Sequence, residues 1–273
     1  MIRVKKLDGT LQKYDPEKLQ SSLLRAGADE AIIDKIMASV EKKLYDGIET
    51  KELFKFVFLE FKKQQPAIAP KYDLKNAILR LGEQGFPFEK LVAKIFQKKG
   101  YATKLNQIIR GTYIQHEIDV AAQKKEENVM IECKHHNKPW VGCSIQTALY
   151  VYARFLDVKD TFTQALLVTN TKFSTQVLDY AKGTGLQLMG WRYPYDNGLE
   201  SNIEKFRLYP VTMLASLDKE KVDMLLRENL FLIGDLCRKD EKELSVMLRI
   251  SKSKAIAILE EARSLCRRNG TAP

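Results

Sequence analysis

Two acidic residues and a lysine lie on two short β-type runs, at a spacing that would let them act together. Asp119 belongs to the first run, Glu132 and Lys134 end the second, and the polar segment 123–128 separates the two. A hairpin centred in that segment would place Asp119 directly opposite Glu132. Lys134 would point to the same face, because it lies two residues beyond Glu132. Two carboxylates and an ammonium group on one face can bind a divalent cation and activate water.

The two carboxylates would repel each other unless a cation lay between them. At a separation of about 5 Å and an effective dielectric constant near 20, the repulsion is roughly 3 kcal/mol. A second interpretation stays open, in which Asp119 and Glu132 are solvated strand positions and Lys134 is their salt-bridge partner. The alternating apolar residues are expected to form the core side of the hairpin: Ile118, Val120, Ile131 and Cys133.

The sequence around these three residues resembles a family of nucleases. Ile118-Asp119-Val120 followed by Ile131-Glu132-Cys133-Lys134 resembles the Mrr-type restriction endonuclease domain of the PD-(D/E)XK group, over roughly residues 85–191. The resemblance implies a restriction endonuclease-like mixed sheet flanked by helices, and cleavage of DNA phosphodiester bonds with Mg²⁺ or Mn²⁺. It also implies that Asp119 and Glu132 hold the metal, and that Lys134 orients the attacking water and helps to deprotonate it.

Two further residues are candidates for the same site. Glu89 lies in the first turn of an expected helix, and the resemblance gives it the role of a third acidic metal ligand. The alternative role is stabilisation of the helix dipole, which contributes about 0.3 to 1 kcal/mol. Gln146 lies four residues before Tyr150 on a helix expected within 140–156, and the pair resembles a Gln-x-x-x-Tyr motif that lies beside the acidic cluster in some related nucleases. Simple packing of Tyr150 stays open.

The composition favours a polyanionic partner. The chain has 273 residues, a formal net charge of +10 and a pI near 9.2, so nucleic acid is the first candidate, although a basic surface could equally serve solubility. The four cysteines lack CxxC spacing, which predicts reduced thiols in a cytoplasmic protein. No run of 18 apolar residues occurs, so no membrane partner is expected. A zinc site is disfavoured, because the candidate ligands do not have the spacing of a standard zinc finger. These candidates are Cys133, His135, His136 and Cys143.

The first 84 residues predict a β-hairpin followed by four helices. The expected helices cover 15–26, 31–44, 50–64 and 72–81. With the stretches 4–9 and 45–50, this segment resembles the ATP-cone domain, a nucleotide-sensing module, although Leu7 stands where that family often has Arg. The resemblance implies that four residues hold the adenine and phosphates of ATP or dATP: Val4, Lys6, Lys18 and Thr50.

The alternative for these four positions is a set of solvated lysines with an ordinary N-cap at Thr50. The phosphate-binding motif G-x-x-x-x-G-K-[ST] is absent, so a bound nucleotide is expected to act as an effector rather than a fuel.

The last part of the chain predicts helices only, over 218–228, 232–238, 241–248 and 251–268. The short helices followed by residues 250–255 resemble a helix-hairpin-helix module, which grips DNA phosphates through backbone amides. Leu248-Arg249-Ile250 stands where a Gly-x-Gly turn is usual. Lys252 and Lys254 could take over the phosphate contacts, or the module could bind protein instead.

Together these patterns predict a multidomain α/β protein. Its parts would be an ATP cone at 1–84, a nuclease domain at 85–210 and a helical module at 211–273. The predicted function is Mg²⁺-dependent cleavage of DNA under allosteric control by an adenine nucleotide. A catalytically silent, nucleotide-responsive DNA-binding protein and an RNA nuclease stay open as alternatives, as does a homo-oligomer.

Overall fold

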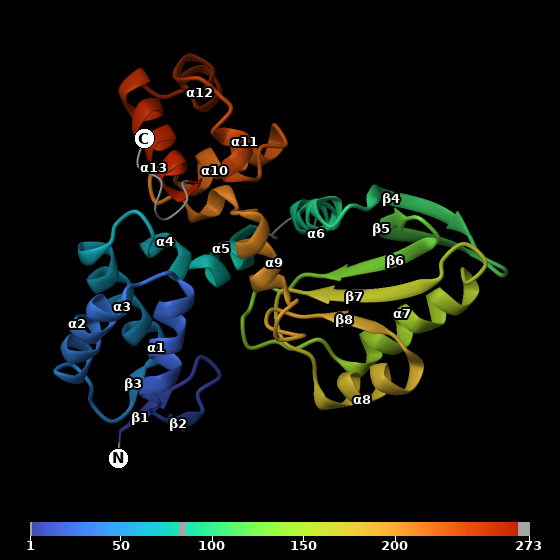
Figure 1. The fold of residues 1–273 in the computed structure, drawn as a ribbon, viewed down its shortest axis with the longest axis horizontal. Helices are drawn as coiled ribbons and strands as arrows, with labels where there is room; N and C mark the ends of the chain where they lie inside the picture. The colour runs from blue at the N-terminus through green and yellow to red at the C-terminus, as the bar shows by residue number, and fades with distance from the viewer. Residues whose placement is uncertain (1, 82–85, 267–273) are drawn as a thin grey trace. The chain divides into compact units, whose positions relative to one another are not determined.

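The structure, a computed structural model, describes residues 2–81 and 86–266. These residues form two units (Figure 1). One unit contains the residues up to 74 together with those from 211 onward, and the other contains residues 75–210. The expected boundary at 84 and 85 falls outside the described residues.

The N-terminal part of the first unit is a small sheet followed by helices. Its strands lie in the order β2-β1-β3, with β1 antiparallel to β2 and parallel to β3. The turn between β1 and β2 uses Gly9 at φ 85°, and Asp15 caps the first helix by accepting the N–H groups of Glu17 and Lys18. The elements are β1 (Arg3–Lys5), β2 (Leu11–Lys13), α1 (Pro16–Arg25), α2 (Glu30–Glu41), β3 (Ile48–Glu49), α3 (Thr50–Gln64) and α4 (Ala69–Tyr72).

Three expectations for this part were wrong in detail. Thr50 is the first residue of α3 rather than its N-cap, and its hydroxyl donates to the carbonyl of Lys5 at 3.0 Å. The helix expected to reach residue 44 ends at Glu41. The helix expected over 72–81 is two helices, because Asp73 leaves the helical conformation between α4 and α5 (Leu74–Leu81). The parallel strand β3 was not predicted; it is only two residues long.

The second unit is built on a five-stranded mixed sheet in the order β4-β5-β6-β7-β8 (Figure 1). The strands β4, β5 and β6 run antiparallel, whereas β6, β7 and β8 run parallel. The elements are α6 (Phe86–Lys98), β4 (Ala102–Arg110), β5 (Gln115–Lys124), β6 (Glu127–Lys134), α7 (Ile145–Asp157), β7 (Gln164–Thr169), α8 (Thr175–Thr184), β8 (Gln187–Met189) and α9 (Leu199–Phe206). This is the restriction endonuclease-like mixed sheet that was predicted.

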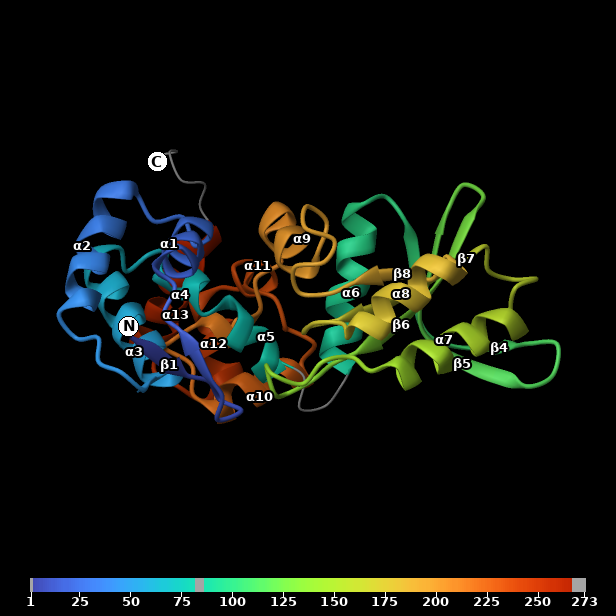
Figure 2. The same cartoon turned by 90° about the horizontal axis from the view of Figure 1, so that it is seen from below.

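Helices cover both faces of the central strands. Val129, Met130 and Ile131 are successive residues of β6 that are all at most 2% exposed, and successive side chains of a strand point to opposite faces. The sequence analysis expected a single core side for the hairpin, whereas both faces of β6 are buried at these residues. The helix α6 packs on β4, β5 and β6, while α7 and α8 lie side by side and share a core cluster with these strands (Figure 2).

Two elements of this unit were not predicted. The strand β4 carries a mixed pattern of exposed and half-buried residues, because it is an edge strand, and this pattern hides its period of two. The sequence of residues 191–209 predicts an irregular connector, but these residues contain α9, whose buried residues are Leu199, Asn202 and Ile203. The turn signals around Pro194 and Gly198 concealed this short helix.

The C-terminal part of the chain is helical, as predicted. Asp240 and Glu243 form a capping box at the start of α12, and Arg249 ends that helix in the left-handed conformation at φ 54°. The elements are α10 (Lys219–Arg227), α11 (Ile233–Leu236), α12 (Glu241–Leu248) and α13 (Lys252–Cys266). The predicted end of the last helix at residue 268 lies outside the described residues. Within the described residues, no helix is long and apolar enough to span a bilayer.

Candidate active site

The candidate site lies where the strands β5 and β6 separate. Their paired residues run from Lys124 and Glu127 near the turn to Val120 and Ile131, which is the predicted register. Beyond Val120, β5 continues alongside β4 only, whereas β6 continues alongside β7 only. Asp119 and Glu132 are the next residues on the two strands, so they flank the fork.

Asp119 is half-buried and bridges this fork. Its Oδ2 accepts the backbone N–H of Cys133 at 2.7 Å. Burial raises the pKa of Asp119, and the charge of Glu117 adds to this, while the Cys133 N–H, Arg154 and Lys134 work in the opposite direction. The other carboxylate oxygen of Asp119 has no hydrogen-bond partner among the described residues.

Glu132 forms an ion pair with a buried arginine. Its Oε2 accepts from Nη1 of Arg154 at 2.5 Å, and the side chains are 19% and 8% exposed. Burial, followed by the negative charge of Asp119, raises the pKa of Glu132 to about 7, although Arg154 and Lys134 favour the ionised form. As with Asp119, the second carboxylate oxygen has no partner among the described residues.

Lys134 ends β6 and is exposed, and its backbone pairs with Thr169 of β7. Its positive charge lowers the pKa of both Asp119 and Glu132, so it acts on the same site.

Glu89 approaches the site from the first turn of α6. Burial raises the pKa of Glu89, followed by the charge of Asp119, while a hydrogen bond from Asn106 lowers it. That bond joins Nδ2 of Asn106 to Oε2 of Glu89 at 3.2 Å, and the same amide lies 3.4 Å from Oε1 of Glu117. Oδ1 of Asn106 is buried without a partner among the described residues.

The oxygen atoms of these side chains suit a hard divalent cation, but three ligand residues do not lie close enough together to form a complete metal site. Carboxylates and an unpaired amide oxygen are the ligand types that Mg²⁺ prefers, and Mg²⁺ usually keeps several waters. Within the described residues, however, no three His, Cys, Asp or Glu side chains are close enough to hold a metal ion together. Asp119 and Glu132 each keep one carboxylate oxygen without a hydrogen-bond partner among the described residues. The same holds for Glu89, whose Oε2 accepts from Asn106. The disfavoured zinc cluster is likewise not formed among the described residues.

Arg154 is the residue that sequence reasoning missed. It lies on α7, four residues after Tyr150 and eight after Gln146, so helical spacing could have indicated it. Its guanidinium group lies 5.3 Å from the Tyr150 ring centroid and donates to the carbonyl of Glu117. Arg154 occupies a buried helix position, where a charged residue usually has a specific partner, and this would have indicated a role for it.

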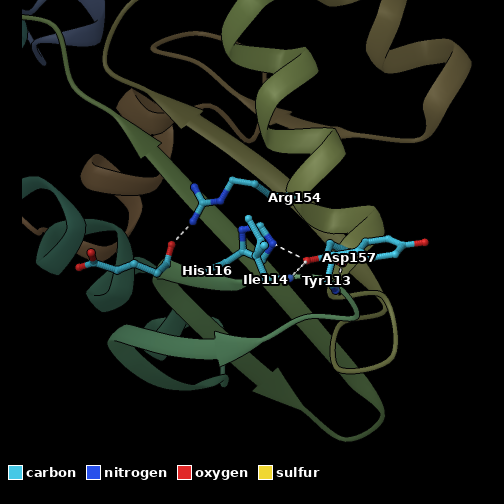
Figure 3. Close-up of polar contacts among 6 residues, drawn as sticks. Tyr113, Ile114, His116, Arg154 and Asp157 are labelled. Carbon is cyan, nitrogen blue, oxygen red and sulfur yellow. Dashed lines mark hydrogen bonds and ion pairs between the residues drawn. The ribbon is translucent and has the colours of Figure 1, made fainter.

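The last turn of α7 also fixes the turn before β5 (Figure 3). The carboxylate of Asp157 accepts the N–H groups of Tyr113 and Ile114 at 2.8 and 3.3 Å and lies 2.7 Å from Nε2 of His116. Burial alone would raise the pKa of Asp157, but the bonds from His116 and the two N–H groups hold it below its usual range. Together with Arg154, Asp157 anchors the half of β5 that leads to Asp119.

Gln146 is not joined to the acidic residues. It is exposed and lines a separate surface cavity of about 550 Å³ with Ser144, Lys172 and Ser174. Within the described residues, no hydrogen bond connects it to Asp119 or Glu132.

The structure brings three of the four predicted nucleotide-binding residues near one another. Val4 is buried on β1, Lys6 follows that strand, and Thr50 is tied to it through the carbonyl of Lys5. Lys18 lies on α1, where its ammonium group is 3.3 Å from Asp15. In the C-terminal part, Lys252 pairs with Glu241 at 3.2 Å, which reduces the charge available to a phosphate.

Comparisons with known proteins agree with this domain order. The ATP cone domain family matches residues 2–74, the restriction endonuclease family matches residues 82–191, and the C-terminal domain of AF1548-like proteins matches residues 209–266.

The chain is 41% identical over 175 residues to an uncharacterized protein of Archaeoglobus fulgidus, covering 64% of this chain and 99% of that protein. Among solved structures, it is similar to the crystal structure of AF1548, a protein of unknown function, with a TM-score of 0.56, 41% identity, and coverage of 65% of this chain and 95% of that one. A further similarity, to the MspJI restriction endonuclease in complex with a 27-mer oligonucleotide, has a TM-score of 0.30, 11% identity, and coverage of 75% and 38%, too low to support an argument. The chain therefore belongs to the AF1548-like family, and it joins an ATP cone domain, a restriction endonuclease domain and an AF1548-like C-terminal domain.

Proposed function

We propose that this protein is a Mg²⁺-dependent endonuclease that cleaves DNA and is regulated by an adenine nucleotide. The observation that carries the proposal is the state of the two carboxylates at the fork. Asp119 and Glu132 each have one oxygen held by a fixed donor, the Cys133 N–H or Arg154, and one oxygen without a partner among the described residues. Donors that hold the far oxygen of a metal ligand orient it and tune its basicity.

In this proposal the residues of the fork divide the work. Asp119 and Glu132 would hold the cation, and Lys134 would orient the attacking water and stabilise charge on the phosphate. A bound divalent cation would supply Lewis acidity and a lowered pKa of water. Arg154 keeps Glu132 in place and favours its ionised form, which is the form that binds metal.

One observation favours the alternative of a silent DNA-binding platform. Arg154 already neutralises Glu132, so a cation has to compete for that carboxylate. An RNA nuclease would use the same residues.

A cleavage screen separates these three functions. Supercoiled, linear, methylated and branched DNA, and an RNA of matched length, are incubated with the full chain in Mg²⁺ or in EDTA, with and without ATP. The proposal expects cleavage of DNA in Mg²⁺ only, at a rate that changes with ATP. Cleavage of RNA alone would identify an RNA nuclease. Binding of DNA without cleavage under any of these conditions would identify a catalytically silent DNA-binding protein.

The proposed effector site is the group Val4, Lys6, Lys18 and Thr50, with ATP or dATP as ligand. Two lysines supply charge for the phosphates, and the Lys18 ion pair with Asp15 is exposed and easily exchanged. The absence of a phosphate-binding loop supports an effector rather than a fuel.

A further inference from the structure

A cavity of about 350 Å³ lies at the carboxyl ends of the parallel strands β7 and β8. Thr171 and Lys172 come shortly after the end of β7, and Trp191 and Arg192 come shortly after the end of β8. In open α/β sheets, this is where ligands bind. Its volume is within the range of small-molecule sites.

The cavity is on the same side of the sheet as the candidate catalytic lysine. Lys134 is the last residue of β6 and pairs with Thr169, the last residue of β7, which runs parallel to it. Val168 pairs in turn with Met189, the last residue of β8. The three strand ends, and the residues that follow them, therefore lie along one edge of the sheet.

The charge of the cavity is positive. Lys75, Lys172 and Arg192 line it, and no acidic side chain does so among the described residues. Arg192 is paired with Glu200 at 2.5 and 3.0 Å, but neither lysine side chain has a hydrogen bond or an ion pair among the described residues. Burial, followed by the charges of Arg192 and Lys172, lowers the pKa of Lys75, and the charge of Glu200 opposes this only in part.

A buried donor in the same place also lacks a partner. Trp191 is 5% exposed, and its Nε1–H is buried without any hydrogen-bond partner among the described residues. Burying such a donor without an acceptor is unfavourable. A ligand with acceptor oxygens would satisfy both this donor and the two lysines.

Aromatic rings complete the lining. Phe173 and Tyr193 meet edge to face with ring centroids 6.0 Å apart, and Tyr193 is 39% exposed. An exposed aromatic face beside a cationic pocket is the usual platform on which a nucleic-acid base stacks.

We propose that this cavity binds one nucleoside monophosphate unit, with the phosphate on Lys75, Lys172 and the Trp191 N–H, and the base against Tyr193 and Phe173. The unit could belong to the 5′-phosphorylated end of a strand or be a free nucleotide. The first source rests on the proposed nuclease function, because it would place a strand end beside Lys134. The pocket itself does not depend on cleavage.

Binding is measured with the full chain in EDTA, so that no cleavage occurs. The probes are thymidine 5′-monophosphate, a 5′-phosphorylated eight-residue oligothymidylate, and the same oligonucleotide without the phosphate. Lys75→Met and Lys172→Gln should each weaken binding of the phosphorylated probes about 10-fold or more, and Trp191→Phe about 2- to 10-fold. Lys159→Gln, an exposed lysine of the same unit away from the cavity, makes the same charge change and should bind as the wild type does.

Two further variants test for effects outside the cavity. Lys13→Ala and Glu126→Gln should leave binding unchanged, because both residues are exposed and neither lines the cavity. A preference for the phosphorylated oligonucleotide that the cavity variants lose identifies a strand end, and equally tight binding of the mononucleotide identifies a free nucleotide. The proposal is overturned if the wild type binds neither phosphorylated probe more tightly than the unphosphorylated one, or if the cavity variants bind as the wild type does. A negative cleavage screen alongside positive binding would refute only the nuclease.

Discussion

At the scale of single residues, the site combines predictable and unpredictable parts. The types and spacing of Asp119, Glu132 and Lys134 predicted the carboxylates at the fork, because a hairpin register follows from its turn. Arg154 could not be predicted in the same way, since it lies 22 residues from Glu132 on another element. The unpaired Trp191 N–H could not be predicted from the sequence either, because the absence of a partner depends on tertiary packing.

The raised pKa of Glu132 predicts how stability depends on pH without metal. Its pKa is about 7 in the folded protein against an ordinary value of 4.5, so between these values the folded state keeps a proton that the unfolded chain has lost. The free energy of unfolding should therefore fall as the pH rises through this window, by roughly 1–3 kcal/mol. Urea unfolding in EDTA from pH 4.5 to 7.5 measures it.

Glu132→Gln should remove this part of the pH dependence, whereas Glu126→Gln on the exposed turn of the same hairpin should keep it. Equal slopes for the wild type and Glu132→Gln would show that Glu132 titrates normally.

Arg154 should set the pH at which metal binds. Arg154→Met removes a charge that lowers the pKa of Glu132, so the carboxylate will ionise only at higher pH. Calorimetric titration with Mn²⁺ across pH 6 to 8.5 should show weaker binding by the variant near neutral pH and recovery at the alkaline end. Arg110→Met, an exposed arginine at the end of β4, is the control. Tighter Mn²⁺ binding by Arg154→Met at every pH would mean that Arg154 only competes with the metal.

At the scale of elements, the sequence predicted the helices and strands whose residue pattern is set by short-range signals. The apolar run 164–169 predicts a strand and the stretch 175–183 predicts a helix, and β7 and α8 begin at these residues, because such runs are short-range signals. The edge strand β4 and the helix α9 were missed, since their residues are patterned by the elements packed against them. The hydrogen bonds from the N–H groups of Tyr113 and Ile114 to Asp157 join the turn before β5 to α7, and we call this contact the clasp. It also belongs to this scale, because only tertiary contact forms it.

Gly111 should test that clasp. A Cβ at Gly111 would lie 2.9 Å from the carbonyl oxygen of Asp157 and would also collide with its carboxylate. Gly111→Ala should therefore destabilise the protein by about 1–3 kcal/mol in urea unfolding, as overpacked substitutions do. Gly183→Ala in α8 meets open space and should stabilise by about 0.5–1 kcal/mol. If Gly111→Ala unfolds like the wild type, the clasp is not a fixed part of the structure.

At the scale of the whole molecule, the three matched domain families and a net charge of +10 support the proposed nuclease under nucleotide control. The domain order followed from sequence, since each domain carries its own motifs. Binding to DNA should weaken as salt rises, with a log-log slope of about −0.9 for each phosphate contact.

Adenine nucleotide should bind the full chain through its N-terminal domain without being consumed. Lys6→Ala and Lys18→Ala should each weaken ATP binding about 10-fold in calorimetry, because each removes a charge-assisted contact to a phosphate. Lys13→Ala, an exposed lysine on β2, should have no effect. Phosphate release at the rate of DNA turnover would show that ATP is a fuel, and unchanged affinity in both variants would point to a different pocket.

The most direct measurement for the central proposal is single-turnover cleavage of an end-labelled DNA duplex by matched variants in Mg²⁺. Asp119→Asn removes one of the two carboxylates at the fork, and Glu126→Gln removes one from the same hairpin without touching the fork. Circular dichroism confirms that both variants are folded. We expect Glu126→Gln to cleave as the wild type does and Asp119→Asn to lose at least about two orders of magnitude in rate. Cleavage by Asp119→Asn at the wild-type rate would contradict the assignment of the active site.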